Sequence, residues 1–330
     1  MFKKIIFFFS TSIIFFILIY FGIGFYIAHS ILRIDHSCGS HEGSLPNTWL
    51  TSNDSQDYKV FEKKILRKNF LSSNYHLDKW EDIYFPSRDK QISINGWLFN
   101  YHPNKPIVIV VHGIFPNGKC KPESNLIASL LIKNEINVLT IDLRNYGQST
   151  RVGNYENLGL SEYKDVLGAY DYLQTLGFKK QQIGLLGISL GSTSVIFAAE
   201  KESDIKAVWL ESSLAEFKMI LKDEISRYGL PHDFGLAVSF AGRLLTGIDP
   251  TKLNPAFSLT PKQNYFFTHG DKDLRVLPRH FLFLKDYATI NNINADFWFI
   301  KNAYHVDGML MFPEEYGKKM KIFFEKNLSK

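Results

Sequence analysis

Cysteine is scarce in this sequence, and its positive and negative charges nearly balance. The 330-residue chain has two cysteines, Cys38 and Cys120, too few for a disulfide framework or for a metal site of four thiolates. We interpret both thiols as incidental, with a single bridge between them as the less favoured alternative. Lysine and arginine number 38 against 33 aspartates and glutamates, a net charge of +5. So mild an excess does not indicate a nucleic-acid-binding protein.

The sequence also lacks the motifs that bind nucleotides and metals. No G-x-x-x-x-G-K-[ST] or G-x-G-x-x-G stretch is present, so a nucleotide cofactor is unsupported. Asp142 stands beside Arg144 without a cluster of histidines, which makes a poor cation site. We interpret residues 142–149 as a structural turn. No internal repeat points to a solenoid. We therefore expect neither a metal nor a cofactor.

An uncharged apolar run opens the chain. Residues 5–32 contain no Lys, Arg, Asp or Glu, and at about 1.5 Å per residue a helix of that length exceeds the roughly 30 Å hydrocarbon core of a bilayer. The run is about twice as long as the core of a cleaved signal peptide, and small residues are poorly spaced around Ala28 and Ser30. We predict an uncleaved signal-anchor at residues 1–33. A buried core helix and a cleaved signal peptide are the alternatives.

The flanking charges predict the orientation of this segment. Lys3 and Lys4 precede the apolar run, and Arg33 is the main nearby cation after it. Positive residues favour the cytoplasmic side of a membrane. We therefore expect a single-pass membrane protein with a cytoplasmic amino terminus and an extracytoplasmic folded domain.

The remaining chain divides into a lead-in and a domain. Residues 34–58 are rich in Ser, Asn, Asp, Gly and His with little apolar periodicity, which indicates a stalk. Residues 58–71 have the mixed basic and apolar pattern of one short helix. We place the stalk and lead-in at residues 34–79 and the folded domain at residues 80–330.

Extended and helical patterns alternate through this domain. The β-branched run at residues 107–111 must be buried on both faces, as in a parallel sheet. Asn95 and Gly96 suggest a turn or bulge within an extended stretch. The predicted strands are residues 81–86, 91–100, 107–111, 136–141, 182–188, 205–210, 264–268 and 296–300. The predicted helices are residues 122–133, 160–176, 190–201, 278–287 and 313–327. This alternation predicts a doubly wound, mostly parallel α/β sheet that binds ligands at the carboxyl ends of its strands.

A G-x-S-x-G pattern follows the predicted strand at residues 182–188. Gly187, Ser189 and Gly191 stand between that strand and a helix rich in small residues. A serine that attacks an acyl carbon needs its hydroxyl raised above the sheet on a tight strand-to-helix turn, and flanking glycines let backbone pack where a Cβ would clash. We predict Ser189 to be a nucleophile. The alternative is a Gly/Ser turn without chemistry.

A base and an acid are expected to serve this nucleophile. A serine hydroxyl reacts poorly near neutral pH, so a histidine must accept its proton and an acid must orient the imidazole ring. His305 is the one histidine after the last predicted strand. The chain order Ser189, Asp273, His305 is the order expected when the nucleophile comes first. Asp271 stays open as the acid, and either aspartate alternatively caps the next helix.

Three other histidines are expected to have structural roles. His280 lies inside an apolar helical run. His112 and His269 belong to His-Gly pairs, and we expect them to shape loops rather than accept protons.

From about Trp80 to Leu328 the chain resembles the α/β-hydrolase superfamily, and within it the single-span membrane-anchored hydrolases and the prolyl-oligopeptidase-like enzymes. The matching motifs are residues 111–113, 142–149, 187–191 and 269–273, together with His305 before the final helix. The resemblance implies that Asp273, the third residue after the His-Gly pair, is the acid. It also implies that the backbone N–H groups of Leu190 and Ile114 form an oxyanion hole.

The family builds a lid where this chain carries an insertion, at about residues 212–261. Residues 214–228 and 236–245 have the pattern of two helices. The second helix would have an apolar face suited to an acyl chain or an ester leaving group, formed by Leu236, Ala237, Val238, Phe240 and Leu244. The equal alternative is that these residues are buried against the sheet.

Together these features predict a membrane-anchored serine hydrolase. We expect it to cleave a carboxylic ester of a small molecule or lipid through an acyl-enzyme on Ser189, without a cofactor. A serine peptidase of the prolyl-oligopeptidase-like type is the alternative enzyme, although the large propeller domain is missing. A non-catalytic hydrolase-fold binding protein is the alternative from another class.

Overall fold

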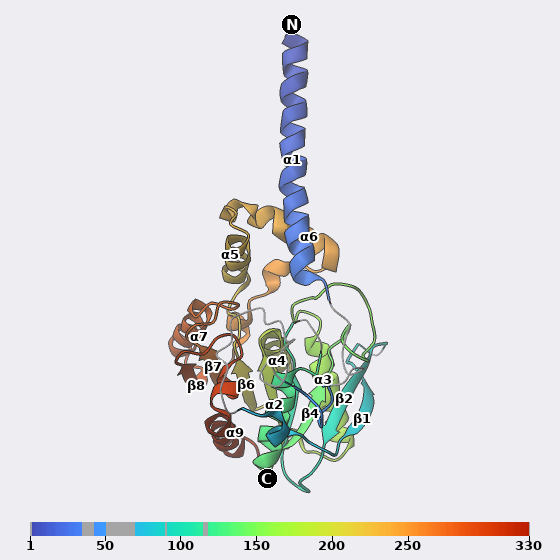
Figure 1. The fold of residues 1–330 in the computed structure, drawn as a ribbon, viewed down its shortest axis with the longest axis vertical. Coiled ribbons are helices and arrows are strands. Elements are labelled where there is room, and N and C mark those ends of the chain that lie inside the picture. Colours follow the sequence, from blue (N-terminus) through green and yellow to red (C-terminus); the bar gives the residue numbers. More distant parts are fainter. Residues whose placement is uncertain (1, 35–42, 51–69, 90, 115–117, 330) are drawn as a thin grey trace.

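A long helix projects from an α/β domain in the computed structural model of the protein (Figure 1). The structure describes residues 2–34, 43–50, 70–89, 91–114 and 118–329. Among these, the α-helices are α1 (Phe2–Leu32), α2 (Pro122–Lys133), α3 (Tyr163–Thr175), α4 (Leu190–Lys201), α5 (Phe217–Arg227), α6 (Gly235–Thr246), α7 (Arg279–Ile290), α8 (Gly308–Met311) and α9 (Pro313–Asn327). Short 3-10 helices cover Ser72–Tyr75, Lys180–Gln182, His232–Phe234, Pro250–Lys252 and Pro255–Ser258.

The strands form a single sheet in the described chain. They are β1 (Glu81–Pro86), β2 (Ser93–Phe99), β3 (Ile107–Val111), β4 (Asn137–Ile141), β5 (Ile183–Ile188), β6 (Ala207–Glu211), β7 (Asn264–Gly270) and β8 (Asn294–Ile300). Their order is β1-β2-β4-β3-β5-β6-β7-β8. β2 is antiparallel to both of its neighbours, and β3 to β8 are parallel. The predicted doubly wound, mostly parallel sheet is confirmed.

Both faces of the sheet are buried, because helices cover each of them. Ile107, Ile109 and Val111 of β3 pack into a core with α3, α4 and α7. Val108 and Val110 alternate to the opposite face, where the core includes α2, α8 and α9. A run of five branched apolar residues suits β3 because each of its side chains meets a helix layer.

The prediction of a turn or bulge at Asn95 and Gly96 is wrong, because both residues lie within β2. The Asn95 side chain is buried and donates to the Asp82 carboxylate at 2.6 Å. Gly96 lets two strands approach, since a Cβ there would lie 2.9 Å from the Thr140 carbonyl oxygen of β4. A tertiary contact, not a turn, therefore accounts for this Asn-Gly pair.

The interpretation of both thiols as incidental is wrong for Cys120. Cys120 is buried and takes part in a disulfide bond. Cys38, the chain's other cysteine, lies outside the described residues, as does most of the helix expected at residues 58–71. A pairing between remote segments depends on tertiary structure, so cysteine spacing alone could not indicate it.

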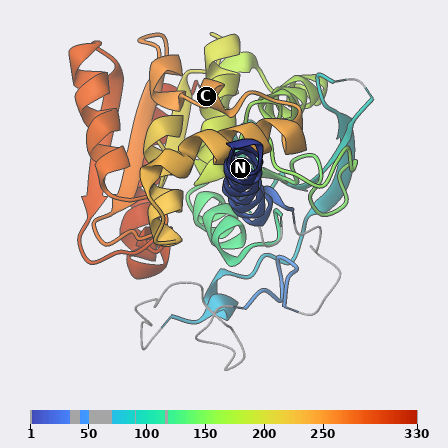
Figure 2. The same ribbon diagram turned by 90° about the horizontal axis from the view of Figure 1, so that it is seen from above.

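The insertion at residues 212–261 lies between β6 and β7 and contains the two expected helices, α5 and α6. α6 crosses α1, as Figures 1 and 2 show from two directions. Gly24 of α1 sits on Ala237 of α6, so closely that a Cβ on Gly24 would lie 2.5 Å from the Ala237 Cβ. Ser10–Leu32 of α1 is apolar and long enough to cross a membrane. The carboxyl-terminal end of this helix is thus part of the folded domain.

A substitution at Gly168 can test how tightly α3 packs on the end of β1. A Cβ on Gly168 would clash with the Pro86 carbonyl oxygen and lie 2.8 Å from the Ser87 Cα. We expect Gly168→Ala to lower the free energy of unfolding by about 1–3 kcal/mol through overpacking, even though alanine favours a helix by about 1 kcal/mol. The control is Gly153→Ala, because a Cβ there meets nothing within 4 Å. Equal melting temperatures for the two variants would contradict this packing.

Candidate active site

Ser189 occupies a strained turn between β5 and α4. Its backbone dihedral angles are φ 53° and ψ −116°, a conformation that costs a non-glycine residue about 1–3 kcal/mol. The Ser189 N–H donates to the carbonyl oxygen of Glu211 at 2.7 Å, which ties the turn to the end of β6. The surrounding elements therefore hold the residue in this conformation at the carboxyl edge of the sheet.

The two glycines of the G-x-S-x-G motif are required by close backbone contacts. A Cβ on Gly187 would lie 2.5 Å from both the Gly191 carbonyl oxygen and the Ser192 Cα. A Cβ on Gly191 would clash with the Val111 carbonyl oxygen of β3. The expectation that a Cβ would clash at these positions is confirmed.

A continuous hydrogen-bonded chain joins Ser189, His305 and Asp273. The Ser189 Oγ lies 3.0 Å from the His305 Nε2, and the His305 Nδ1 lies 2.8 Å from the Asp273 Oδ2. An ionised carboxylate only accepts hydrogen bonds, so the Nδ1 atom carries a proton, and Nε2 is free to accept the serine proton in the neutral ring. The structure thus brings together three predicted residues that lie far apart in the sequence.

The surroundings of Asp273 keep its carboxylate ionised. Its Oδ1 accepts the backbone N–H groups of Arg275 at 2.8 Å and Val276 at 2.9 Å. Burial would raise the pKa of Asp273, but the charge of His305 and the hydrogen bonds lower it below its usual value. The neighbouring His269 Nε2 lies 3.3 Å from the Asp273 Oδ2 and contributes to the same shift. An ionised Asp273 can fix the tautomer of His305.

Asp271, the alternative acid, points to a different loop. Its Oδ1 accepts the backbone N–H of Asn302 at 2.6 Å, whereas the described carboxylate partner of the His305 ring is Asp273. Asp271 therefore connects the loops after β7 and β8, and the geometry favours Asp273 as the partner of His305.

The two predicted oxyanion-hole residues lie beside Ser189. Leu190 begins α4, and both Leu190 and Ile114 line the pocket that contains Ser189. Gly113 is so close that a Cβ there would lie 3.1 Å from the Ser189 Cβ. The Lys121 ammonium group donates to the carbonyl oxygens of Gly113, at 3.0 Å, and Ile114. The three residues that follow Ile114 lie outside the described chain.

A buried ion pair anchors the far end of this loop. The Lys119 Nζ lies 2.6 Å from the Asp142 Oδ2 and also donates to Asn95 at 2.5 Å. The Lys119 backbone N–H donates to the other Asp142 oxygen at 2.7 Å. Sequence reasoning missed this lysine, because nothing in the local pattern shows that a lysine faces a core carboxylate.

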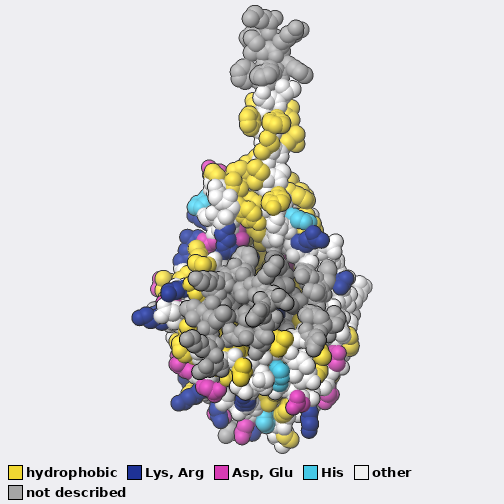
Figure 3. Space-filling model, viewed as in Figure 1, with side chains coloured by type: hydrophobic (Ala, Val, Ile, Leu, Met, Phe, Trp, Pro, Cys, Tyr) yellow, Lys and Arg dark blue, Asp and Glu magenta, His cyan; other side chains and the backbone are white. Residues whose placement is uncertain are grey.

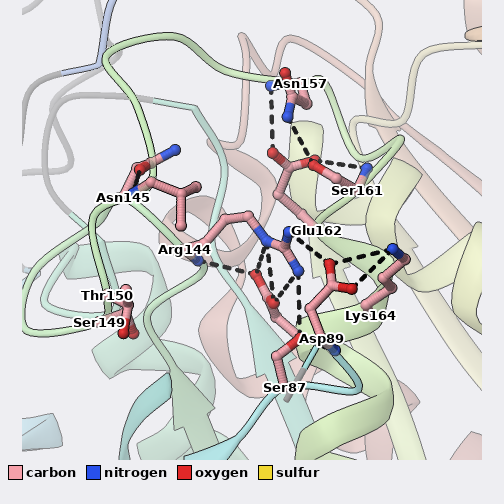
Figure 4. Close-up of polar contacts among 12 residues, drawn as sticks. Ser87, Asp89, Arg144, Asn145, Ser149, Thr150, Asn157, Ser161, Glu162 and Lys164 are labelled. Atoms are coloured by element: carbon pink, nitrogen blue, oxygen red, sulfur yellow. Dashed lines mark hydrogen bonds and ion pairs between the residues drawn. The ribbon is translucent and has the colours of Figure 1, made fainter. Parts of the chain in front are cut away.

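The segment after β4 is held by a second buried network, shown in Figure 4. The Arg144 guanidinium group contacts the buried Asp165 carboxylate at 2.6 Å and the Asp89 carboxylate at 3.0 Å. Removing one partner of a buried ion pair leaves an uncompensated charge. The structural role expected for residues 142–149 agrees with these contacts.

Glu211 is a second residue that sequence reasoning missed. Its buried carboxyl group accepts the hydroxyls of Tyr316 at 2.7 Å, Ser212 at 3.0 Å and Thr268. Burial raises the pKa of Glu211, although the three hydroxyl donors oppose the shift. The signal available in the sequence was an acidic residue at the end of an otherwise apolar strand. Through its carbonyl oxygen, Glu211 positions the Ser189 turn.

The other histidines near the site are buried and bonded as neutral rings. The His112 Nε2 accepts the Leu143 N–H at 3.1 Å, and the His280 Nδ1 accepts the Ala215 N–H at 3.0 Å. Burial lowers the pKa of His112, His269 and His280 to about 4. Their expected structural roles agree with these bonds.

A pocket above Ser189 has mostly apolar walls. It contains about 780 Å³ of space, including the part open to solvent. Ser189 and Leu190 line it, and the insertion supplies Leu214, Phe217 and Val238. An apolar chain attached to a carbonyl group at Ser189 would find matching surface here.

Comparison with known proteins supports the fold. A family model described as "alpha/beta hydrolase fold" matches residues 106–257. The chain is similar to an esterase from Pyrococcus furiosus, with 20% identity, a TM-score of 0.63, and coverage of 82% of this chain and 100% of that one. An acylaminoacyl peptidase from Pyrococcus horikoshii has 20% identity and a TM-score of 0.58, and the match covers 76% of this chain and 42% of that one.

A further similar structure is Est1E from Butyrivibrio proteoclasticus with ferulic acid bound. It has 21% identity and a TM-score of 0.56, with coverage of 73% of this chain and 98% of that one. The chain has the α/β-hydrolase fold. The resemblance noted in its motifs is confirmed at the level of this fold.

Because His112, His269 and His280 are buried as neutral rings, we expect the free energy of unfolding to depend on pH in the acid range. Between about pH 6.5 and pH 4 the unfolded chain binds protons that the folded chain excludes. The free energy of unfolding should therefore fall as the pH falls, by up to about 1.4 kcal/mol per pH unit for each histidine. Denaturant unfolding at several pH values measures this slope.

The variant His280→Gln should show a shallower slope in that window only. Above pH 7, where the ring is neutral in both states, wild type and variant should have parallel profiles. A variant slope equal to that of wild type below pH 6.5 would contradict the neutral assignment of His280.

Proposed function

We propose that the protein is a serine hydrolase that cleaves a carboxylic ester through an acyl-enzyme on Ser189. The observation that carries this proposal is the hydrogen-bonded chain from Asp273 through His305 to Ser189, which ends in an apolar pocket. The esterase among the similar structures is consistent with this reaction.

The proposed reaction proceeds in two halves. The Ser189 Oγ attacks the carbonyl carbon of the ester, and its proton passes to the His305 Nε2. The carbonyl oxygen becomes an oxyanion, which the backbone N–H groups of Leu190 and Ile114 stabilise. When the intermediate collapses, the bond to the alcohol breaks and the alcohol leaves with the proton from His305.

Water then completes the cycle. His305 removes a proton from the water as the oxygen attacks the acyl carbon, and it returns the proton to the Ser189 Oγ when the ester bond to the enzyme breaks. Asp273 remains ionised throughout and stabilises the imidazolium form of His305. The products are a carboxylic acid and an alcohol, and no cofactor takes part.

A peptidase is the second candidate function. The acylaminoacyl peptidase among the similar structures supports it. The two reactions share Ser189, His305 and Asp273, so they differ in the leaving group that the pocket accepts. The prevailing apolar lining, which matches an acyl chain, favours the ester. A non-catalytic binding protein remains the candidate from another class.

We further propose that α1 anchors the protein in a membrane with the domain on the extracytoplasmic side. Ser10–Leu32 is long and apolar enough to span a bilayer, and Lys3 and Lys4 precede it. The disulfide bond of Cys120 supports an oxidising compartment for the domain.

Kinetics of single variants test the proposed residues. We expect Ser189→Ala to lower kcat for a p-nitrophenyl ester by about 10⁴-fold and Asp273→Asn by about 10²–10⁴-fold, because the base loses its target or its correct tautomer. Asp271→Asn is the matched control and should retain kcat within about threefold. If Asp271→Asn loses most of its kcat while Asp273→Asn stays active, then Asp271 and not Asp273 is the acid.

Substrate class is tested with paired substrates of equal acyl length. Purified protein should hydrolyse p-nitrophenyl esters with a kcat/KM at least about 100-fold above that for the matching p-nitroanilides. Faster cleavage of the anilides would support the peptidase instead. Turnover of neither class would favour the binding protein.

Protease treatment of spheroplasts tests the orientation. With the full chain in the inner membrane of a bacterial host, added protease should digest the domain while a cytoplasmic marker protein stays intact. Protection of the domain in intact spheroplasts, with digestion only after lysis, would contradict the proposed topology.

A further inference from the structure

The end of α1 forms part of the pocket above Ser189. Ala28, Ile31 and Leu32 line the pocket together with Ser189 and with residues of the insertion. The same helix that is long and apolar enough to cross a membrane therefore contributes side chains within the pocket of the candidate nucleophile.

α1 is fixed in this position by contacts on two sides. On one side, Ile27, Ala28 and Leu32 share an apolar cluster with Val238 and Ala241 of α6. On the other side, the carbonyl oxygen of Leu32 accepts a hydrogen bond from the Glu156 backbone N–H at 2.8 Å. The Ile34 backbone N–H donates to the carbonyl oxygen of Asn154 at 3.0 Å. The end of α1 is therefore packed into the domain as one side of the pocket and is not merely a connection to the rest of the helix.

The contacts between α1 and the insertion begin partway along the apolar run of the helix. Its polar and aromatic contacts with the insertion begin at Tyr20, whose hydroxyl donates to the Asp233 carbonyl oxygen at 2.6 Å and whose ring lies 5.0 Å from that of Phe234. Residues 5–19, the uncharged residues before Tyr20, would span about 22 Å as a helix, which is shorter than the roughly 30 Å hydrocarbon core. The insertion would then lie at or slightly within the membrane surface.

The outer face of α6 is suited to that surface. Leu236, Phe240 and Leu244 recur every fourth residue and are 70%, 52% and 63% exposed, so they form one apolar stripe on the helix. Figure 3 shows hydrophobic side chains gathered along α1 and around the helices at its base. Exposed Tyr26 of α1 lies beside Tyr228, with ring centroids 6.4 Å apart. Such aromatic residues are common at the bilayer interface.

We propose that α1 is a specificity wall of the acyl pocket, and that the enzyme hydrolyses membrane-lipid esters whose acyl chain enters from the bilayer surface beside α1 and α6. The proposal rests on the proposed ester hydrolysis at Ser189. It assigns the substrate class, because an apolar pocket whose lining includes the end of a helix long enough to cross a membrane suits a long aliphatic chain. Ile31 is the residue expected to set the accepted chain length.

The first test changes the wall at Ile31 and measures chain-length preference. The substrates are p-nitrophenyl acetate and p-nitrophenyl decanoate, and the measured quantity is the ratio of their kcat/KM values in detergent. Ile31→Trp should lower the decanoate-to-acetate ratio at least tenfold, because the larger side chain fills the space for the acyl chain. Ile31→Ala should move the ratio in the opposite direction.

The matched control is Ile19→Trp, the same change at an exposed position of α1. It should keep the wild-type ratio. Melting temperatures of all the variants report whether each one folds. If Ile31→Trp and Ile31→Ala both fold with the wild-type ratio, α1 is not a wall of the acyl pocket.

The second test asks whether the substrate enters from the bilayer. The full chain is reconstituted into phosphatidylcholine vesicles that contain a fluorogenic long-chain acyl ester, and the same ester is presented in detergent for comparison. Changing Leu236 and Leu244 together to Gln should lower the ratio of vesicle to detergent turnover at least fivefold.

The control for this test is the pair Leu282→Gln and Ile290→Gln on α7, two residues that are likewise exposed. The α7 pair should keep the wild-type ratio. An unchanged ratio in the α6 pair would overturn entry from the bilayer.

These outcomes are distinct from failure of the proposed function. If α1 is not a wall of the pocket, or if the substrate does not enter from the bilayer, the wild-type protein still hydrolyses the acetyl ester. Failure of ester hydrolysis at Ser189 abolishes turnover of every ester, short or long, in wild type as well.

Discussion

Ser189 keeps its strained backbone because β5, β6 and α4 close around it and leave no room to relax. Its N–H is held by the Glu211 carbonyl oxygen, and the glycines on either side permit contacts that a Cβ would prevent. A sharp turn at this edge raises the hydroxyl toward the loops that follow β7 and β8. Those loops carry Asp273 and His305, so the three side chains meet because three parallel strands end at one edge.

Supporting groups around this edge set the protonation states that the proposed chemistry needs. Asp273 stays ionised because of His305 and two backbone N–H groups. His112 and His280 stay neutral because each accepts a backbone N–H in a buried position. The ring of His305 therefore has a fixed donor side toward Asp273 and an accepting side toward Ser189.

Local sequence patterns predicted most of this framework. The strand at residues 107–111 and the helices at residues 122–133, 190–201 and 313–327 have the predicted bounds, because their periodicity and end residues are strong local signals. Ser189 was also predictable, since the clash that makes its flanking glycines necessary lies within the same turn. His305 was predicted from chain order and strand ends, whereas spacing left Asp271 and Asp273 open and only the resemblance to the α/β hydrolases favoured Asp273.

Features set by remote contacts were not predictable. Asn95 and Gly96 resemble a turn in sequence, but a buried carboxylate and a neighbouring strand hold them in β2. The buried pairing of Lys119 with Asp142 and the disulfide of Cys120 depend on segments that approach only in the folded chain. The packing of Gly24 on Ala237, which fixes α1 against α6, has no local signal either.

A long apolar helix, the insertion between β6 and β7 and the candidate nucleophile thus form one structural unit. The most direct measurement of the account's central claim is peptide mass spectrometry after reaction with a fluorophosphonate ester, a reagent that transfers its phosphonyl group to an activated serine. The account predicts a single adduct on the peptide that contains Ser189, and no adduct in the His305→Ala variant, because the hydroxyl then lacks its base. An adduct on another serine, or none on the folded wild-type protein, would contradict it.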